Sequence, residues 1–436
     1  MREMKDSGIE WIGEIPEEWR LTRIGYLFKT IGSGTTPSSS DSRYYDGNHN
    51  WLQTGDLNDG IIITTEKTVT DLAIEKHSVL RQYSIGSLVV AMYGATIGKL
   101  GLLNIPCYTN QACCVLEEPI NVDTKYVYYW LFCNRQNLIT FSLGGGQPNI
   151  SQNTIREFKI CLPSKIEQES IVSYLDTKCA EIDALIAAKE KTNALLREYR
   201  QSVIYEAVTK GLDPNAPVKD SGVEWIGEIP ANWTPIRLKY VINSIESGTS
   251  VNAEDHPCGK NEYGVLKTSC VLTGQFQSDQ NKTVLTEEYS RLSCPVRKDS
   301  VIVSRMNTPN LVGACGYVEN DHPNLFLPDR LWQVSFRLNC LSKYMWYFLS
   351  SEYTKAIYAS ICTGTSGSMQ NISQEQFGDI IFFLPSINEQ ATIVRTLDTA
   401  CEQIDSIIED NSSCISQLKE YRQSLIYEAV TGKTEV

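Results

Sequence analysis

The feature that most constrains this chain is that two of its segments occur twice. Lys5–Trp19 reads KDSGIEWIGEIPEEW and Lys219–Trp233 reads KDSGVEWIGEIPANW, with 12 of 15 positions identical. Glu198–Thr209 and Glu420–Thr431 agree at 11 of 12 positions. Because both pairs keep the same order at offsets of 214 and 222 residues, the sequence predicts two copies of one unit of roughly 215 residues.

The composition is typical of a globular protein. The 436 residues are enough for two domains with cores of their own, and 42% of them are hydrophobic and 21% charged. No apolar run approaches the ~20 residues of a membrane helix, and Met1–Trp11 lacks the apolar stretch of a secretory signal. Many of the 14 cysteines stand inside apolar runs, which indicates buried free thiols. A cytoplasmic location is therefore expected.

The net charge of −13 argues against bulk attraction to nucleic acid. No long section of the chain carries more Lys and Arg than Asp and Glu, whereas counterion release from DNA needs clustered cations. Two alternatives remain open at this point. The protein does not bind nucleic acid, or it binds through local patches with the help of a partner.

Each copy changes its sequence texture once. Segments 60–65, 87–91 and 110–116 are rich in β-branched residues and are separated by turn residues, which predicts strands. Segments 167–209 and 389–431 contain neither Gly nor Pro and predict two long helices. The domain prediction is a first globular domain, a first helical spacer, a second globular domain and a second helical spacer, at residues 1–162, 163–213, 214–384 and 385–436.

Both long helices carry a seven-residue period. One stripe comprises Leu175, Ile182, Lys189, Leu196 and Val203 in the first helix and Leu397, Ile404, Asn411, Leu418 and Leu425 in the second. The companion core positions are expected at Leu185 and Tyr199 in the first helix and at Ala400, Ile407, Cys414 and Tyr421 in the second. This period predicts a coiled coil. Lys189 and Asn411 interrupt both stripes at the same point, either to specify register or as a solvated weak spot.

A chain built as domain, helix, domain, helix closes on itself if the two helices pair antiparallel. The predicted fold class is α/β: two mixed α/β globular domains are joined by two long helices that form an antiparallel coiled coil. The internal repeat then has pseudo-twofold character, with one domain at each end of the coil. Similar domains held at a set distance suit a two-part target on DNA.

Several segments together resemble the specificity subunit of Type I restriction–modification systems. They are the repeated KDSGIEWIGEIPxxW motif, the loop Ser33–Pro37, the segments Gly144–Ser151, Asp299–Arg305 and Gly364–Ser373, and the Pro-x-x-x-Glu-Gln motifs at Pro163–Gln168 and Pro385–Gln390. The resemblance covers essentially the whole chain. It implies that each globular part is a target recognition domain for one half of an interrupted DNA sequence. It also implies two adenine methyltransferase (modification) subunits docked on the helices, with restriction subunits in the larger assembly.

Base recognition in the major groove uses Arg or Lys for guanine and Asn or Gln for adenine. By that chemistry the candidates are Gln147 and Asn149 in the first copy and Arg305, Gln370 and Asn371 in the second. Asn149 and Asn371 align, so the alternative for both is to hold a turn. A salt bridge is the alternative for Arg305. Lys267 is a further candidate for contact with a base or a phosphate, with a solvated surface lysine as its alternative.

Small polar loops donate hydroxyl and amide groups to phosphate, which positions DNA without reading it. Ser33, Thr35, Thr36, Ser366 and Ser368 are the candidates for such contacts. Tyr93 and Lys99 flank Gly94 and Gly98 in another loop suited to the DNA backbone, although Tyr93 is equally suited to a core.

Catalytic motifs are missing from the sequence. The Asn-Pro-Pro-aromatic or Asp-Pro-Pro-aromatic tetrad of an adenine methyltransferase does not occur, and Gly94–Leu100 departs from a phosphate-binding loop. The four histidines lack metal-ligand spacing, so no catalytic residue, metal or cofactor is expected. The favoured function is a non-catalytic DNA-recognition subunit. The alternative is a two-headed scaffold that binds protein partners without DNA specificity.

Overall fold

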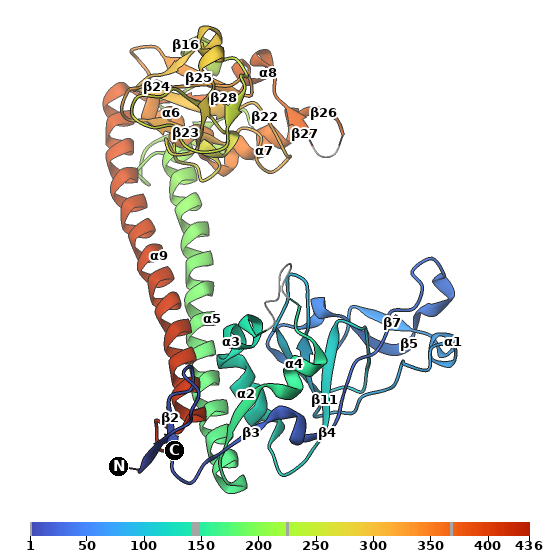
Figure 1. The fold of residues 1–436 in the computed structure, drawn as a ribbon. Coiled ribbons are helices and arrows are strands. Elements are labelled where there is room, and N and C mark those ends of the chain that lie inside the picture. The colour runs from blue at the N-terminus through green and yellow to red at the C-terminus, as the bar shows by residue number, and fades with distance from the viewer. Residues whose placement is uncertain (1, 142–148, 224–225, 367–368) are drawn as a thin grey trace. The chain divides into compact units, whose positions relative to one another are not determined.

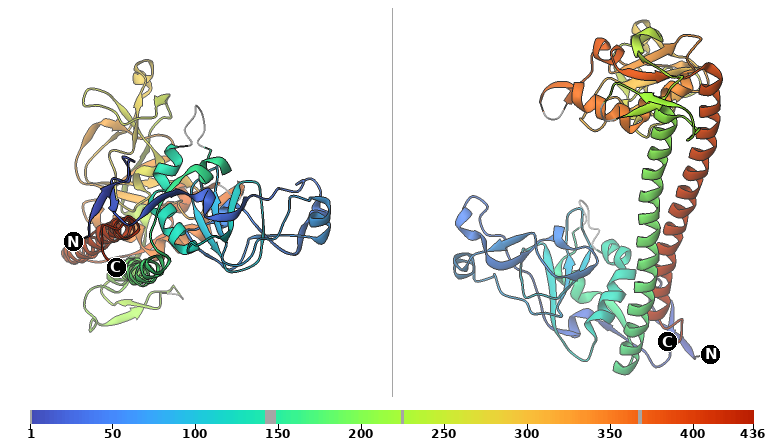
Figure 2. Two further views of the ribbon diagram at one scale, coloured as in Figure 1. Left: turned by 60° about the horizontal axis from the view of Figure 1, so that its bottom comes forward. Right: turned by 180° about the vertical axis from the view of Figure 1, so that it is seen from behind.

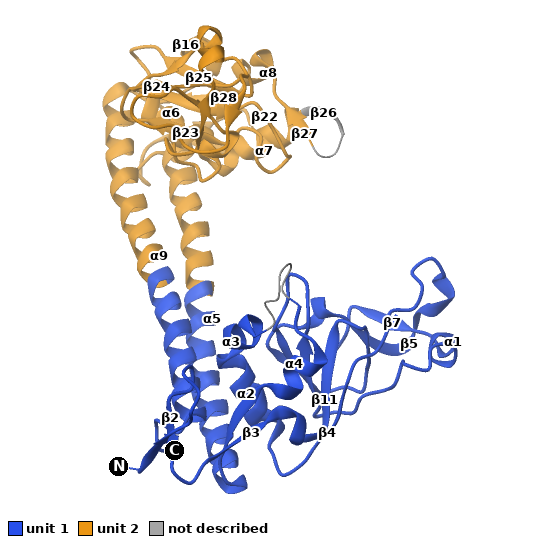
Figure 3. Ribbon diagram, in the orientation of Figure 1, with its two compact units in different colours: residues 1–190, 412–436 blue, residues 191–411 orange. Residues whose placement is uncertain are grey.

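The computed structural model describes residues 2–141, 149–223, 226–366 and 369–436 (Figure 1). The chain forms two compact units (Figure 3). Unit 1 comprises Met1–Glu190 and Ser412–Val436, and unit 2 comprises Lys191–Asn411. Each unit therefore contains one mixed α/β body together with one part of each long helix.

Unit 1 is organised around a five-stranded sheet. Its strands lie in the order β4 (Phe28–Gly32), β11 (Cys113–Pro119), β8 (Leu88–Ala91), β9 (Leu100–Leu103) and β6 (Gly60–Ile62). Smaller sheets are formed by β10 (Tyr108–Thr109), β5 (Tyr45–Leu52) and β7 (Lys67–Val69), by β12 (Lys159–Leu162) with β3 (Arg20–Arg23), and by β1 (Met4–Asp6) with β2 (Glu14–Pro16). The short helices are α1 (Asp71–Lys76), α2 (Thr124–Cys133), α3 (Arg135–Thr140) and α4 (Gln152–Glu157).

Unit 2 repeats this plan with local changes. Its central sheet has the order β16 (Ile242–Ser247), β25 (Leu331–Phe336), β21 (Ser300–Ser304) and β23 (Cys315–Val318). A second sheet contains β17 (Ala253–Glu254), β19 (Asn281–Val284), β18 (Gly264–Leu266), β24 (His322–Phe326) and β20 (Pro295–Val296). The remaining strands are β22 (Met306–Asn307), β27 (Met369–Asn371) and β26 (Thr363–Ser366) in one sheet, β15 (Thr234–Arg237) with β28 (Ile381–Leu384), and β13 (Val218–Asp220) with β14 (Glu228–Pro230). The short helices are α6 (Ser342–Ser350), α7 (Glu352–Ile361) and α8 (Gln374–Gly378).

The repeated sequence motifs attach each body to the start of a long helix, α5 (Lys165–Lys210) or α9 (Ile387–Val430). In unit 1 the buried Trp19 donates its indole N–H to Glu167 at 3.1 Å. In unit 2 Trp233 donates in the same way to Glu389 at 2.8 Å. The Glu of the Pro-x-x-x-Glu-Gln motif is therefore the acceptor for the last Trp of the KDSGxEWIGEIPxxW motif.

The Gln of the same motif makes a second attachment. Gln168 is buried, accepts from the backbone N–H of Asp123 at 2.8 Å and donates to the carbonyl of Pro163 at 3.0 Å. Gln390 accepts from Leu341 N–H at 2.9 Å and also donates to Pro385. Since an unsatisfied buried amide costs about 1–3 kcal/mol, these bonds explain why a polar residue occupies an interior position.

A third attachment uses a carboxylate on the helix. Asp398 of α9 accepts from the Tyr347 hydroxyl at 2.7 Å and pairs with Lys343 at 2.9 Å. Asp176 of α5 accepts from Tyr129 at 2.8 Å and pairs with Lys125. The two units thus hold their bodies on their helices through the same hydrogen bonds.

Within each unit, α5 and α9 run side by side in opposite directions (Figure 2). In unit 1, Asp183 pairs with Arg422 and Glu190 with Lys419. In unit 2, Asn193 accepts a hydrogen bond from Asn411 at 3.0 Å and Arg200 pairs with Asp405 at 3.1 Å. The residue number falls on α9 as it rises on α5, which confirms the antiparallel pairing. Asn411, which interrupts the apolar stripe of α9, is thus paired with Asn193 of the facing helix.

Four of the six companion positions predicted for the coiled coil are wrong, and the other two, Ala400 and Cys414, are half-buried. Tyr199 is 60% exposed and Ile407 is 48% exposed, and Leu185 and Tyr421 are also exposed. The second row of side chains that packs between α5 and α9, which completes the seam of the coiled coil, instead lies four residues after the first stripe. It includes Cys179, Ile186, Asn193, Cys401 and Ile415. Arg200 and Arg422 belong to this row and form ion pairs, so polar residues concealed it from a search for apolar side chains.

The predicted fold class of two mixed α/β domains with two long antiparallel helices is confirmed. The cysteines are free thiols and most are buried, as expected. Among the residues that the structure describes, no helix has both the length and the apolar character needed to cross a membrane.

Candidate nucleic-acid interface

Three loops of unit 1 meet at one end of the central sheet. Met92 donates its backbone N–H to Ala112 at 2.8 Å, and Ile150 donates to Met92 at 2.7 Å. Gly98 donates to Ala91 at 2.8 Å, which closes the turn that follows β8. We call the loops that these bonds hold together, with the loop Ser33–Thr36 described below, the loop cluster of unit 1.

Unit 2 has the same backbone frame. Arg305 donates its backbone N–H to Arg330 at 3.1 Å, Ile372 donates to Arg305 at 3.0 Å, and Gly313 donates to Ser304 at 2.8 Å. These three bonds match those of unit 1 one for one. They make Arg305 the counterpart of Met92, Arg330 the counterpart of Ala112, and Asn371 the counterpart of Asn149.

A glycine brings a fourth loop into each cluster. A Cβ on Gly34 would lie 1.8 Å from the carbonyl oxygen of Thr109, and a Cβ on Gly248 would lie 1.6 Å from that of Leu327. Only glycine permits this close approach. The loops then join the clusters through a side-chain bond, from Thr36 to Gln111 in unit 1 and from Ser250 to Asp329 in unit 2.

Most residues singled out in the first copy meet in the loop cluster of unit 1. Ser33 is half-buried and accepts from the Gln152 amide at 2.8 Å. The Thr35 carbonyl accepts from the Trp51 indole at 3.3 Å. The other members are Thr36 and Asn149, which are exposed, and Tyr93 and Lys99, which are half-buried. Tyr93 also packs against the hydrophobic core. Gln147 lies outside the described residues.

With the exception of Lys267, the residues singled out in the second copy gather around the small sheet β22–β27–β26. Met306 faces Asn371 and Asn307 faces Gln370 across β22 and β27. Figure 1 shows β26 and β27 as a hairpin at the edge of unit 2. Ser366 ends β26, and Ser368 lies outside the described residues.

Two side chains in this cluster have informative polar environments. Arg305 donates its Nε to the carbonyl of Asp329 at 2.8 Å, so the guanidinium is oriented by the backbone and makes no carboxylate ion pair among the described residues. Asn371 Oδ1 is buried and accepts no hydrogen bond from any described residue. A buried acceptor without a partner costs free energy, and because the protein covers this atom it offers no contact surface of its own.

Lys267 lies apart from the cluster. It precedes the 3-10 helix Thr268–Val271, and its ammonium is 2.9 Å from Asp255, which also pairs with Lys282 at 3.4 Å. The hydrogen bond from Lys267 lowers the pKa of Asp255. The charge of Lys267 is therefore balanced within the second sheet of unit 2.

Sequence reasoning missed several members of the clusters. Arg330 is exposed beside Arg305, and Asp329 and Gln111 anchor the glycine loops. Insertions change the offset between the copies from 214 to 222 residues, which hid these equivalences. The signal in the sequence was the Ser-Gly-Thr triplet that both copies share at Ser33 and Ser247.

The clusters offer hydrogen-bond donors and acceptors on protruding loops. In the part of the chain that the structure describes, no group of His, Cys, Asp or Glu side chains is arranged to hold a metal ion. The arrangement suits binding of a polar ligand along loop tips.

The comparisons with known proteins agree with this arrangement. The family model described as Type I restriction modification DNA specificity domain matches residues 16–195 and 230–412. The Type I restriction enzyme EcoKI specificity subunit of Escherichia coli K12 is 21% identical over 433 residues, covering 97% of this chain and 90% of that protein. The MjaVIII specificity subunit of Methanocaldococcus jannaschii is 26% identical over 428 residues, covering 97% and 94%.

Solved structures share the fold. A chain from a study of complex assembly and conformational transition of the type I R-M system aligns with a TM-score of 0.72 at 16% identity, covering 96% of this chain and 99% of that one. The HsdS subunit from Thermoanaerobacter tengcongensis aligns with a TM-score of 0.50, covering 96% and 98%. In Type I systems the specificity subunit recognises the DNA target and other subunits carry out the catalysis. Because the two matches to the family model together cover most of the chain, the chain belongs to the Type I restriction–modification specificity subunits, which are non-catalytic and recognise DNA.

Proposed function

We propose that the two units read the two halves of one interrupted DNA sequence. The observation that carries this proposal is that both loop clusters use the same backbone hydrogen bonds and present different side chains. A common frame orients both clusters alike toward a duplex, and the matched position carries the buried Met92 in one and the half-buried Arg305 in the other. Only unit 2 therefore has an oriented guanidinium there for a guanine edge. A scaffold without DNA specificity is not favoured, because both matched segments belong to a DNA specificity family.

At residue level, base contacts are assigned to Gln147 and Asn149 in the first copy and to Arg305, Gln370 and Asn371 in the second. The Arg305 guanidinium supports this role, since it is oriented by the Asp329 carbonyl and can donate to a guanine edge. Phosphate contacts are assigned to Ser33, Thr35, Thr36, Tyr93, Lys99, Lys267, Ser366 and Ser368.

The same proposal covers the partners and the division of the chain. Segments 1–162 and 214–384 act as the recognition domains, and segments 163–213 and 385–436 act as spacers. Two modification subunits dock on the spacers, and restriction subunits complete the assembly in the cytoplasm. Partner subunits would supply phosphate contacts, which reconciles DNA binding with a net charge of −13.

A single-molecule map of N6-methyladenine across the host genome, with and without this gene, tests the function. Loss of methylation at one gapped, two-part motif upon deletion is the expected result, and it reveals both half-sites. An unchanged map in a host whose modification subunits are expressed would contradict the proposal and favour the scaffold.

The spacer role has its own test. Inserting about four residues, roughly one turn, into one long helix is expected to lengthen the recognised gap and to leave both half-sites unchanged. Altered half-sites would show that the helices do not act as a ruler.

A further inference from the structure

Unit 2 contains an open groove of about 910 Å³ between α9, α6 and the turn after β23. Aromatic side chains line part of it, among them Tyr317, Trp346 and Tyr347. Trp346 donates its indole N–H to the carbonyl of Gly274 at 2.8 Å, which holds the ring in place. The groove is therefore a preformed feature with a partly aromatic lining.

The charged residues of the groove are unbalanced. Five carboxylates line it, against two cations and His322. Four of the carboxylates, Asp398, Glu402, Asp405 and Glu409, follow one another on α9 at spacings of four, three and four residues. That spacing places all four on one face of the helix, where like charges destabilise one another.

Only half of this face is neutralised by the chain itself. Lys343 lies 2.9 Å from Asp398 and 3.6 Å from Glu319, and Arg200 lies 3.1 Å from Asp405. Glu402 and Glu409 are exposed and form no ion pair with any described residue.

The internal repeat provides a comparison for these two residues. The positions of α5 in unit 1 that correspond to Asp398, Glu402, Asp405 and Glu409 are Asp176, Ala180, Asp183 and Ala187. Asp176 pairs with Lys125 and Asp183 with Arg422, as Asp398 and Asp405 pair with Lys343 and Arg200 in unit 2. The two carboxylates without a partner are therefore an addition to unit 2 on an otherwise repeated frame.

We propose that this groove, the acidic groove, binds a lysine- or arginine-bearing segment of a modification subunit. Unpaired carboxylates beside aromatic faces suit ammonium and guanidinium groups, and they repel the phosphates of DNA. The proposal rests on the proposed function and adds an asymmetry to it. The modification subunit at unit 2 makes a charge contact that the one at unit 1 does not make.

The test uses the full-length chain with purified modification subunit. Glu402→Ala with Glu409→Ala converts the face to the residues present in unit 1, and alanine preserves the helix. Binding is measured as a function of NaCl concentration, and the stoichiometry is measured by native mass spectrometry. The expected result is about a 10-fold weaker affinity for one of the two modification subunits at low salt, with a shallower salt dependence.

The control variant is Asp410→Ala with Glu420→Ala, which removes the same charge from exposed positions of α9 outside the groove. It is expected to change the affinity less than about 2-fold. A second variant, Glu402→Gln with Glu409→Gln, keeps the side-chain size and should reproduce the loss.

Two results overturn the inference in distinguishable ways. If the wild-type chain assembles and its DNA motif is methylated, while the groove variants bind with wild-type affinity and salt dependence, the acidic groove is not a docking site and the proposed function stands. If the wild-type chain binds no modification subunit at any salt concentration, the inference and the docking part of the proposed function fail together.

Discussion

The central strands of the two units, β11 and β25, occupy the same place in their sheets, and one of their matched buried positions is apolar in unit 1 and an amide in unit 2. Val115 of β11 lies opposite Val89 of β8, and Gln333 of β25 lies opposite Ile302 of β21. Val115 is 0% exposed within an apolar cluster, and Gln333 is 3% exposed. One sheet design therefore has a purely apolar centre in unit 1 and a polar centre in unit 2.

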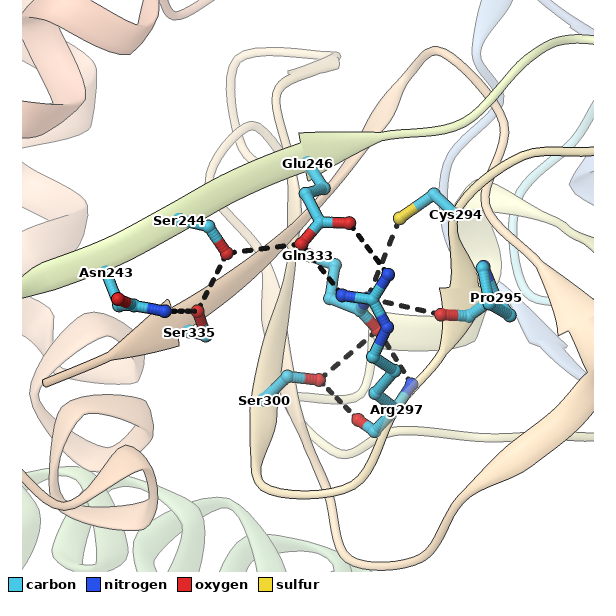
Figure 4. Close-up of polar contacts among 9 residues, drawn as sticks. All are labelled: Asn243, Ser244, Glu246, Cys294, Pro295, Arg297, Ser300, Gln333 and Ser335. Carbon is cyan, nitrogen blue, oxygen red and sulfur yellow. Dashed lines mark hydrogen bonds and ion pairs between the residues drawn. The ribbon is translucent and has the colours of Figure 1, made fainter. Parts of the chain in front are cut away.

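Gln333 is tolerated because both ends of its amide are paired (Figure 4). Its Nε2 donates to the carbonyl of Pro295 at 3.2 Å, and its Oε1 accepts from the backbone N–H of Arg297 at 2.9 Å. Arg297 in turn makes a two-bonded ion pair with Glu246 at 2.8 and 2.9 Å. The repeated backbone therefore accommodates either an apolar or a polar side chain at this position, provided that every buried polar group has a hydrogen-bond partner.

Exchanging Val115 and Gln333 between the two sheets is expected to cause the largest loss of stability. Val115→Gln places an amide among apolar side chains, and Gln333→Val leaves Arg297 N–H and the Pro295 carbonyl unpaired. We expect each to cost about 3 kcal/mol, measured by urea denaturation, with hydrogen exchange by mass spectrometry assigning the loss to β11 or to β25. Val115→Ile serves as the control for a change of volume without polarity. Near-neutral exchanges would mean that neither interior is specialised.

Gln333 also shows which features of the fold are not predictable from the sequence. The repeat, the strands near 87–91 and 110–116, and the long helices follow from local pattern and were predicted. Gln333 depends on Arg297 and Pro295, which stand more than thirty residues away along the chain. No local pattern identifies such partners.

The same limit applies to predicting the members of the loop clusters and the side chains packed between α5 and α9. Asn149, Arg305 and Asn371 were proposed from the chemistry of their side chains, whereas Arg330 enters its cluster through one backbone bond to Arg305. Arg200 stands in the seam because Asp405 faces it. Propensity and period describe single segments, and these roles arise only from the pairing of segments.

The two loop clusters should respond unequally to truncation at their matched position. Arg305→Ala removes an oriented guanidinium, and we expect binding of the assembled complex to its target duplex to weaken about 10- to 100-fold. Met92 is buried in the hydrophobic core, so Met92→Ala removes no group that faces a duplex, and we expect the affinity of the folded complex to change less than about 3-fold. Fluorescence anisotropy at fixed salt concentration measures both. Arg337→Ala, an arginine on the opposite end of β25, is the control, and equal effects at Arg305 and Met92 would contradict a different readout by the two units.

The hydrogen bonds that attach Trp19 and Trp233 to the long helices differ in their surroundings, and we expect their loss to have a smaller effect on stability. Glu167 accepts from Trp19 and also pairs with Arg2, whereas Glu389 accepts from Trp233 and, at 3.4 Å, from Asn232. We expect Glu389→Ala to cost about 1 kcal/mol and Glu167→Ala slightly more, because an ion pair is lost as well.

Thermal unfolding followed by tryptophan fluorescence measures both losses. Glutamine at either position keeps an acceptor for the indole and should restore most of the stability. The exposed Glu169→Ala on the same turn of α5 is the control. A larger loss in unit 2 than in unit 1 would show that Arg2 adds nothing to the attachment.

The last difference between the units is a dependence on pH. Glu246 stands opposite Gln333, whereas the matching position opposite Val115 is Gly32. The side-chain hydrogen bond from Arg297 holds the pKa of Glu246 below its ordinary value of 4.5. Because the folded pKa is depressed, the ion pair contributes its full stability above pH 4.5 and loses it as the pH falls through the lowered pKa.

With 36% of the Glu246 side chain exposed, solvent screening limits this contribution to about 0.5 kcal/mol. We expect Glu246→Gln to lower the melting temperature slightly at about pH 7, and we expect this effect to fade as the pH falls through the lowered pKa of Glu246. Hydrogen exchange corrected for the intrinsic rate should show the change in β25 and leave β11 unaltered, since Gly32 supplies no carboxylate there. If hydrogen exchange of the wild-type chain shows the same pH dependence in both strands, the acid sensitivity lies elsewhere in the chain. The Arg297–Glu246 pair would then serve only to orient the backbone N–H of Arg297, from which Gln333 accepts.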